Sequence, residues 1–169
     1  MSAIRCRLIA DDANNRAAVD ALFMRCGDYT ELVEGSAPNA ADTVEFFTAV
    51  PAGFSAADAF LFSINIDAVM VGIAGVLRGW NAPDKAHLGL LLLAPEVRGR
   101  GVGTVAVAQL ESFVGGWQQV NTMRLAVVVT NQNGLVFWRK MGYVETGEVK
   151  PKTPPYVADI VVMEKCLAR

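Results

Sequence analysis

The sequence predicts an α/β fold with a mixed sheet of about seven strands and about four helices. A strand-like apolar run over 86–93 leads through a Gly/Arg loop into a helix with apolar residues on one face. The segment 123–130 is rich in Val and Leu, which is typical of a strand buried on both faces. Two further strand patterns, 59–65 and 68–77, flank a tight turn as in a hairpin.

The other elements follow from local apolar periodicity and from the residues that start and stop helices. Asp11 and Asp12 are good N-caps, and Gly27 is expected to end the helix that they start. Gly115 and Gly116 end the helix that follows the Gly/Arg loop. The predicted elements are, in chain order, a strand over 4–9, a helix over 12–25, one short helix within 28–51, the hairpin, the strand over 86–93, a helix over 101–115, the strand over 123–130, a helix over 132–141, and strands over 143–149 and 157–166.

Length and composition predict one domain over residues 1–169, because 169 residues of which 53% are hydrophobic can build one well-buried core. Neither a run of roughly 18 apolar residues nor a signal-peptide core is present, so we expect a soluble cytoplasmic protein without a membrane partner. Three dispersed cysteines predict neither disulfides nor a metal site. A net charge of −2 predicts no nucleic-acid partner.

The Gly/Arg loop is the strongest functional signal. Glycines at 99, 101 and 103 allow the backbone at a helix N-terminus to approach a phosphate, and Arg98 and Arg100 add positive charge. A dinucleotide fingerprint would need glycine where Thr104 stands, and no Gly-Lys-Ser/Thr sequence is present. The alternative is an ordinary strand-to-helix turn with solvated arginines.

The segment Arg98-Gly-Arg-Gly-Val-Gly103 fits the pattern Arg/Gln-x-x-Gly-x-Gly/Ala and resembles the acyl-CoA pyrophosphate loop of the GNAT N-acetyltransferase superfamily. Residues 131–143, Asn-Gln-Asn-Gly-Leu-Val-Phe-Trp-Arg-Lys-Met-Gly-Tyr, resemble that superfamily's Asn-x-x-Ala-x-x-Phe-Tyr-x-Lys-x-Gly-Phe segment. The resemblance implies a GNAT-like fold and transfer of an acetyl group from acetyl-CoA directly to an amine, in a ternary complex and without metal.

By the same resemblance, exposed backbone groups of Leu91, Leu92 and Leu93 pair with the pantetheine arm and polarise the thioester. The backbone amides of the Gly/Arg loop hold the pyrophosphate. The alternative for the leucines is a core strand, and for Asn131 a simple helix cap. The implied acetyl-CoA site comprises Leu91, Leu92, Leu93, Arg98, Gly99, Arg100, Gly101, Val102, Gly103, Thr104, Asn131, Phe137 and Trp138.

Trp138 departs from the family pattern, in which a tyrosine serves the departing thiolate. Because indole does not ionise usefully, we expect Trp138 to pack on the cofactor while solvent or another acid, such as Tyr143 or Tyr156, protonates the sulfur. His87 is the candidate general base, against the alternative of a structural histidine. Other candidate bases are Glu96, Asp84, Glu34 and Glu45.

The amine acceptor is not specified by the sequence. An aromatic set either lines the acceptor pocket or packs in the core, and four acidic residues keep polycationic acceptors open. We predict an N-acetyltransferase for a primary amine of a small molecule or peptide, with a homodimer possible. The alternatives are an acyl-CoA-binding sensor with weak transfer and an unrelated nucleotide-binding protein. The aromatic set is Phe46, Phe47, Phe54, Phe60 and Phe62, and the acidic residues are Glu31, Glu34, Asp42 and Glu45.

Overall fold

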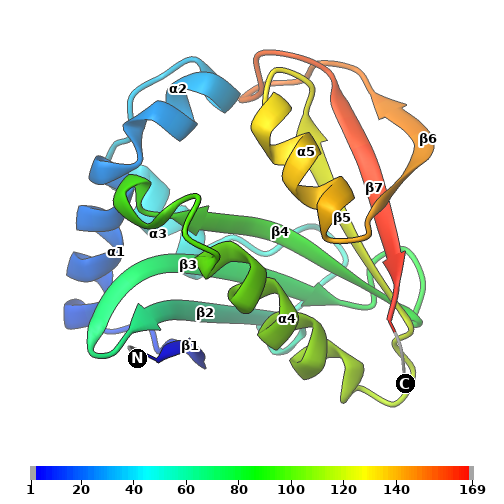
Figure 1. The fold of residues 1–169 in the computed structure, drawn as a ribbon, viewed down its shortest axis with the longest axis horizontal. Coiled ribbons are helices and arrows are strands. Elements are labelled where there is room, and N and C mark those ends of the chain that lie inside the picture. Colours follow the sequence, from blue (N-terminus) through cyan, green and yellow to red (C-terminus); the bar gives the residue numbers. More distant parts are fainter. Residues whose placement is uncertain (1–2, 168–169) are drawn as a thin grey trace.

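The computed structural model describes residues 3–167 and contains a seven-stranded mixed sheet with helices packed against it (Figure 1). The strand order is β1-β2-β3-β4-β5-β7-β6, and every neighbouring pair is antiparallel except β4 and β5. The predicted mixed α/β sheet is therefore confirmed. The strands are β1 (Ile4–Leu8), β2 (Ala59–Ile66), β3 (Val69–Arg78), β4 (Lys85–Leu93), β5 (Thr122–Val128), β6 (Val144–Lys150) and β7 (Ile160–Cys166).

Five α-helices are present where about four were expected. The extra helix arises because Gly27 begins a helix instead of only ending one. Asn39 then starts a further helix through a capping box with Asp42, so the region 28–51 holds two helices and not the single one predicted. The helices are α1 (Ala13–Arg25), α2 (Gly27–Glu34), α3 (Ala40–Thr48), α4 (Val102–Gly115) and α5 (Gln132–Lys140), with 3-10 turns at Ala56–Asp58 and Pro95–Val97.

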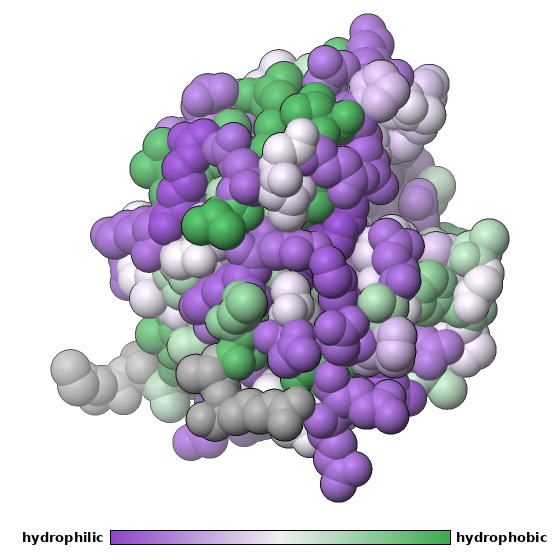
Figure 2. Space-filling view, turned by 90° about the vertical axis from the view of Figure 1, so that its right-hand side faces the viewer, coloured by the Kyte–Doolittle hydropathy of each residue, from purple (hydrophilic) through white to green (hydrophobic). Residues whose placement is uncertain are grey.

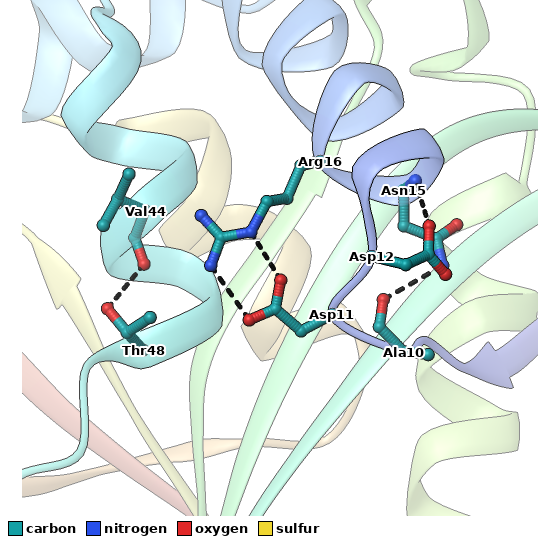
Figure 3. A network of polar contacts seen from close by, with 7 residues as sticks. All are labelled: Ala10, Asp11, Asp12, Asn15, Arg16, Val44 and Thr48. Carbon is teal, nitrogen blue, oxygen red and sulfur yellow. Dashed lines mark hydrogen bonds and ion pairs between the residues drawn. The ribbon is translucent and has the colours of Figure 1, made fainter.

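Polar contacts fix the start of α1 (Figure 3). The Asp12 side chain accepts a hydrogen bond from the Asn15 backbone N–H at 2.9 Å, as the predicted N-cap requires. Arg16 forms an ion pair with Asp11, and its guanidinium lies over the Phe47 ring at 5.3 Å. The first turn of α1 is thus tied to the helix that packs beside it.

The main core includes buried residues of α1, α4 and the sheet, and α4 crosses in front of the strands in Figure 1. Ala106 and Leu110 of α4 are fully buried there. Phe60 and Phe62 of β2 both pack edge-on against Phe113 of α4, with ring centroids 5.7 and 5.0 Å apart. These two phenylalanines therefore take the core role that was one of the two alternatives for them.

The surface on the β6 side of the molecule is mostly hydrophilic, and hydrophobic residues form small groups on it (Figure 2). Val144 and Val149 of β6 are among the exposed hydrophobic side chains. None of the helices within residues 3–167 has the length and apolar character needed to cross a membrane.

Candidate active site

The central feature of the site is a split between the parallel strands β4 and β5. The two strands pair from Lys85 opposite Thr122 only as far as Leu88 opposite Leu125, although both continue beyond that point. The split begins at a β-bulge, because Val76 of β3 pairs with Leu88 and Gly75 pairs with Leu90, which leaves Gly89 as the extra residue. Past Gly89, the β5-facing edge of β4 offers backbone groups that have no strand partner.

A cavity of about 710 Å³ occupies this split, which is within the usual range for small-molecule sites. One wall is the stretch 87–93 of β4, and the opposite wall is 125–128 of β5. The start of α4 and the inner face of α5 close it along the other sides. The predicted cofactor residues that line it are Leu91, Leu92, Leu93, Arg98, Gly99, Gly101, Gly103, Thr104, Asn131, Phe137 and Trp138.

The N-terminus of α4 forms one end of the cavity. Gly101 is the N-cap in the left-handed region (φ 80°), a conformation that disfavours other residues, and no side chain caps the helix. The backbone N–H groups of Val102, Gly103 and Thr104 therefore have no partner within the helix, an arrangement of donors that attracts anions. Val102 can take part only through its backbone, since its side chain is buried in the core.

Gly103 is needed for a different reason, which is close packing. A Cβ at this position would lie 3.2 Å from the Phe137 ring and 3.4 Å from Leu93 Cδ1. Phe137 of α5 therefore rests directly on the first turn of α4, and β4 lies against the same point. This contact brings the two separate sequence motifs into one site.

The two arginines of the loop have different positions. Arg98 lines the cavity, but its Nε donates to the Leu93 carbonyl at 2.8 Å and its guanidinium forms an ion pair with Asp28 of α2. This ion pair lowers the pKa of the Asp28 carboxyl. Arg100 is exposed and does not line the cavity. Arg98 thus braces α2 against the end of β4.

Asn131 and Trp138 place α5 along the cavity. The Asn131 side-chain oxygen accepts a hydrogen bond from the Gly134 N–H at 2.9 Å, so Asn131 caps the helix and also lines the cavity. Trp138 is 9% exposed and packs edge-on against Phe137, with ring centroids 4.9 Å apart. The helix-cap role that was an alternative for Asn131 is present together with the position at the cavity.

Tyr143 was predicted as a possible acid, and this prediction is wrong. The side chain is 1% exposed, does not line the cavity, and donates its hydroxyl to Glu111 of α4 at 3.0 Å. Burial, and then the Glu111 carboxylate, raise the Tyr143 pKa far above its ordinary value. Its hydroxyl points to the α4 side of the sheet because Lys165 holds Glu111 there, at 2.8 Å.

His87 lies where the split begins and lines the cavity. Its ring stacks on Trp80 with centroids 4.5 Å apart, and Nδ1 is 3.2 Å from Nη1 of Arg124. Burial first, and then the charges of Arg124 and Lys150, lower the His87 pKa to about 3. The position agrees with the prediction, but a ring with its lone pair engaged and so low a pKa does not fit a general base.

Sequence reasoning missed α2, which closes the cavity. Tyr29 and Val33 of this helix line it, and the Val33 carbonyl accepts the Val157 N–H at 3.1 Å. Thr130 Oγ1 donates to the α2 carbonyl of Leu32 at 3.2 Å. No local pattern marks these residues, because their role depends on α2 reaching across the split to the loops that follow β5 and β6.

Two tyrosine hydroxyl groups lie at this closed side. Burial raises the pKa of Tyr29 to about 12, and burial followed by Glu34 and Glu45 raises that of Tyr156. Tyr156, one of the two substitute acids considered above, lines the cavity and is 37% exposed. Glu34 itself has a raised pKa, because of its burial and of the nearby Asp42 and Glu45.

The aromatic set proposed for the acceptor lies outside the cavity. Phe46 and Phe47 pack against the core, and Phe54 stacks on Trp80 at 5.4 Å. Within residues 3–167, no group of three or more His, Cys, Asp or Glu side chains is placed to hold a metal ion.

Comparisons with known proteins agree with this geometry. An acetyltransferase of Thermus thermophilus superposes with a TM-score of 0.77 at 20% identity, covering 99% of this chain and 100% of the other. An aminoglycoside acetyltransferase in complex with coenzyme A gives 0.75 at 18% identity, covering 97% and 95%. A Vibrio cholerae spermidine N-acetyltransferase in complex with CoA and spermine gives 0.73 at 13%, covering 97% and 95%.

These likenesses show the fold. No curated protein matches the chain by sequence at a significant level. The family model described as the acetyltransferase (GNAT) family matches residues 28–143, which is more than half of the chain and includes the split, the α4 N-terminus and α5. The chain belongs to the GNAT acetyltransferase family.

Proposed function

We propose that the chain is an acetyl-CoA-dependent N-acetyltransferase that moves an acetyl group directly to a primary amine of a small molecule or peptide, in a ternary complex. The observation that carries this proposal is the split between β4 and β5, which opens onto the uncapped N-terminus of α4. One end of the cavity offers amide donors for a diphosphate, and its wall offers unpaired backbone for an extended amide-bearing chain.

The residues present fit acetyl-CoA. Gly101 and Gly103 leave the α4 amides open, and no side chain occupies the cap position. Backbone groups of Leu91 to Leu93 are free of β5. Asn131 and Phe137 border the same space. Bound there, acetyl-CoA supplies the activated acetyl group, and the chain's own residues bind it, orient it and exclude water.

Direct transfer is supported by the state of the nearby cysteine. The Cys26 Sγ lies 3.5 Å from the Leu93 carbonyl, and burial raises the pKa of this thiol. A buried, protonated thiol hydrogen-bonded to a carbonyl is a poor nucleophile. The neutral amine therefore attacks the thioester carbonyl carbon itself, a C–N bond forms while the C–S bond breaks, CoA leaves as its thiolate, and the proton lost by the nitrogen passes to solvent or to that thiolate.

Two of the similar solved structures support an acceptor that carries an amine, because their names refer to aminoglycoside and spermidine. In this chain, burial and then the nearby Asp42 and Glu45 raise the Glu34 pKa. Glu34 and Glu45 also act on Tyr156, which lines the cavity. Negative charge on this side favours a cationic acceptor.

The runner-up is an acyl-CoA-binding protein with weak transfer activity, and one observation favours it. Trp138 replaces the tyrosine of the family pattern, and Tyr143 is turned away from the cavity. Isothermal titration with acetyl-CoA, combined with release of free CoA on a panel of amines, separates the two functions. Tight binding without CoA release on any amine would support the runner-up.

The binding step has a matched pair of variants. Gly101→Val introduces a side chain at a positive φ in the anion site, whereas Gly147→Val does so at a positive φ on β6, away from the cavity, and both positions are otherwise open. We expect only Gly101→Val to lower affinity for CoA, by tenfold or more, which is about 1.4 kcal/mol. Equal affinity of both variants for CoA, or wild-type preference for ATP or NAD, would contradict the proposal.

A further inference from the structure

We propose that His87 acts as a neutral hydrogen-bond donor through Nε2–H to the oxygen of the acyl group, and that Arg124 is the positioning residue that sets this tautomer. This inference rests on the proposed acetyl transfer, and it reverses the role of base expected for a lone histidine. Its starting point is the contact between His87 Nδ1 and Arg124 Nη1, at 3.2 Å.

The tautomer follows from the chemistry of the partner. A guanidinium has only donors, so a hydrogen bond from Arg124 requires a lone pair on Nδ1. A neutral imidazole that accepts at Nδ1 carries its proton on Nε2. Arg124 is itself fixed, because it is 3% exposed and its guanidinium lies 5.7 Å from the centre of the Trp80 ring.

The groups around the ring keep it neutral. Trp80, from the loop after β3, covers one face of the imidazole. The ionised groups that act on it from β5 and β6 are the cations Arg124 and Lys150, whereas only the Arg124 backbone carbonyl favours a second ring proton. Glu148 of β6 is 3.8 Å from Arg124 Nη2 and balances that charge. Burial and the two cations together outweigh the carbonyl, in agreement with a pKa of about 3.

The Nε2 edge of the ring faces the bulge at Gly89. A Cβ on Gly89 would lie 4.0 Å from Nε2, and both residues line the cavity. The hydrogen bond of this ring that the structure shows is the one at Nδ1, and the other polar group that acts on the ring is the Arg124 backbone carbonyl. Since Gly89 has no side chain, the donor is left open to a group that enters the split.

The cavity places an acyl group at this end. Its anion site at the start of α4 adjoins Leu93, and Leu93 is four residue steps along β4 from Gly89, about 13 Å. An acyl-CoA held by its phosphates at α4 extends along this edge toward Gly89 and His87. A donor there stabilises the negative charge that develops on the acyl oxygen as the amine attacks.

The tautomer can be measured directly, because His87 is the sole histidine of the chain. In tag-free protein, ¹H–¹⁵N spectra of the ring should show a proton on Nε2, none on Nδ1, and no titration between about pH 5 and 8. Arg124→Met should make the ring titrate nearer the ordinary value of about 6.5. Lys150→Met, which removes a charge but no hydrogen bond, should leave the tautomer unchanged.

A wild-type ring that titrates near pH 6.5, or that carries its proton on Nδ1, would overturn the assignment. Circular dichroism shows whether Arg124→Met remains folded. If this variant unfolds, the wild-type and Lys150→Met spectra still decide the tautomer.

Ligand binding and kinetics test the hydrogen bond from Nε2–H to the acyl oxygen separately from the tautomer. Acetyl-CoA should shift the Nε2–H resonance, whereas CoA, which lacks the acyl group, should shift it much less. His87→Gln keeps a donor near the Nε2 position but no base, so kcat should stay within about tenfold of wild type, whereas His87→Leu should lose about 100-fold with KM for acetyl-CoA unchanged.

The outcomes separate this inference from the proposed function. If neither CoA nor acetyl-CoA binds, the proposed function fails while the tautomer is still measured. If both bind with equal effect on Nε2–H, or if His87→Leu keeps wild-type kcat, the donor role fails and the acetyltransferase assignment stands. Loss of activity in His87→Gln together with loss of an acid limb in the pH–rate profile would assign a base.

Discussion

The Asp28 carboxylate of α2 and the Arg98 guanidinium of the loop before α4 form an ion pair, and both residues line the cavity. Arg98 also donates to the Leu93 carbonyl at the end of β4. The pair therefore ties three elements together at the point where β4 leads into the Gly/Arg loop. Arg98 is held by these contacts as a structural brace, although it occupies a motif position that suggests a phosphate ligand.

Asp28→Asn and Arg98→Gln should each weaken CoA affinity by a similar factor, and the double variant should be no worse than either, because both break the same brace. If Arg98 instead binds the diphosphate, Asp28→Asn would free it and tighten binding. Titration calorimetry of Asp28→Asn with CoA distinguishes the brace from the diphosphate ligand. Arg25→Gln, which breaks a neighbouring exposed pair with Glu96, is the control and should leave affinity unchanged.

Gly103→Ala should lower CoA affinity by about tenfold, equivalent to about 1.4 kcal/mol, because the new methyl group meets the Phe137 ring at 3.2 Å. Gly115→Ala is the control in the same helix, since nothing lies within 4 Å of its added Cβ. It should stabilise the protein by up to about 0.5 kcal/mol through the better helix propensity of alanine. Titration calorimetry measures the CoA affinity, and thermal unfolding measures the stability. Unchanged CoA affinity in Gly103→Ala would mean that Phe137 yields without disturbing the loop.

Local patterns predicted the elements that build the α4 end of the cavity. The apolar run of β4, the glycines of the loop and the α4 face lie next to one another in the chain, so short-range rules describe them well. The same rules placed the hairpin and β5. Asn131 caps α5 at the position where the second motif begins.

What the sequence did not reveal depends on contacts between distant segments. Gly27 is a plausible helix stop, but it begins α2, which contacts the loop after β6 through the Val33 carbonyl. Tyr143 and Tyr156 carry the same hydroxyl group, but Tyr143 donates to Glu111 of α4, whereas Tyr156 lies in the loop between β6 and β7 and lines the cavity. No local sequence pattern distinguishes His87, whereas the environment of its ring is set by Arg124 of β5 and by Trp80.

Tyr156→Phe should lower kcat by about 100-fold while leaving the dissociation constant for acetyl-CoA unchanged, if its hydroxyl serves the departing sulfur. Tyr143→Phe is the matched control and should keep wild-type kcat. It should cost about 1.5–3 kcal/mol of stability, because the Tyr143 hydroxyl donates to the Glu111 carboxylate. Steady-state kinetics and denaturant unfolding give the two quantities. Equal kcat in wild type and Tyr156→Phe would leave protonation of the sulfur to solvent.

Stability should fall as the pH is lowered from about 6.5 toward 4, in part because of His87. Its pKa is about 3 in the folded protein, against about 6.5 in the unfolded chain, so the unfolded state binds more protons in this window. The stabilising contribution is complete above pH 6.5 and is lost as the pH falls. Urea unfolding of wild type and His87→Gln at several pH values isolates this contribution. If the free energy of unfolding depends on pH equally in both proteins, the pKa of His87 does not differ between the folded and unfolded states.

Trp138→Tyr tests why the family's tyrosine is absent here. The Trp138 ring lines the cavity and packs against Phe137 and Tyr143, with centroids 4.9 and 5.2 Å apart. A tyrosine at this place brings an ionisable hydroxyl to the α5 side of the cavity, so kcat should rise if proton supply to the sulfur limits turnover. Trp138→Phe, which makes a similar loss of volume without a hydroxyl, is the control. A drop of equal size in both variants would show that the indole is needed for packing on the cosubstrate, and the wild-type rate would then be limited at another step.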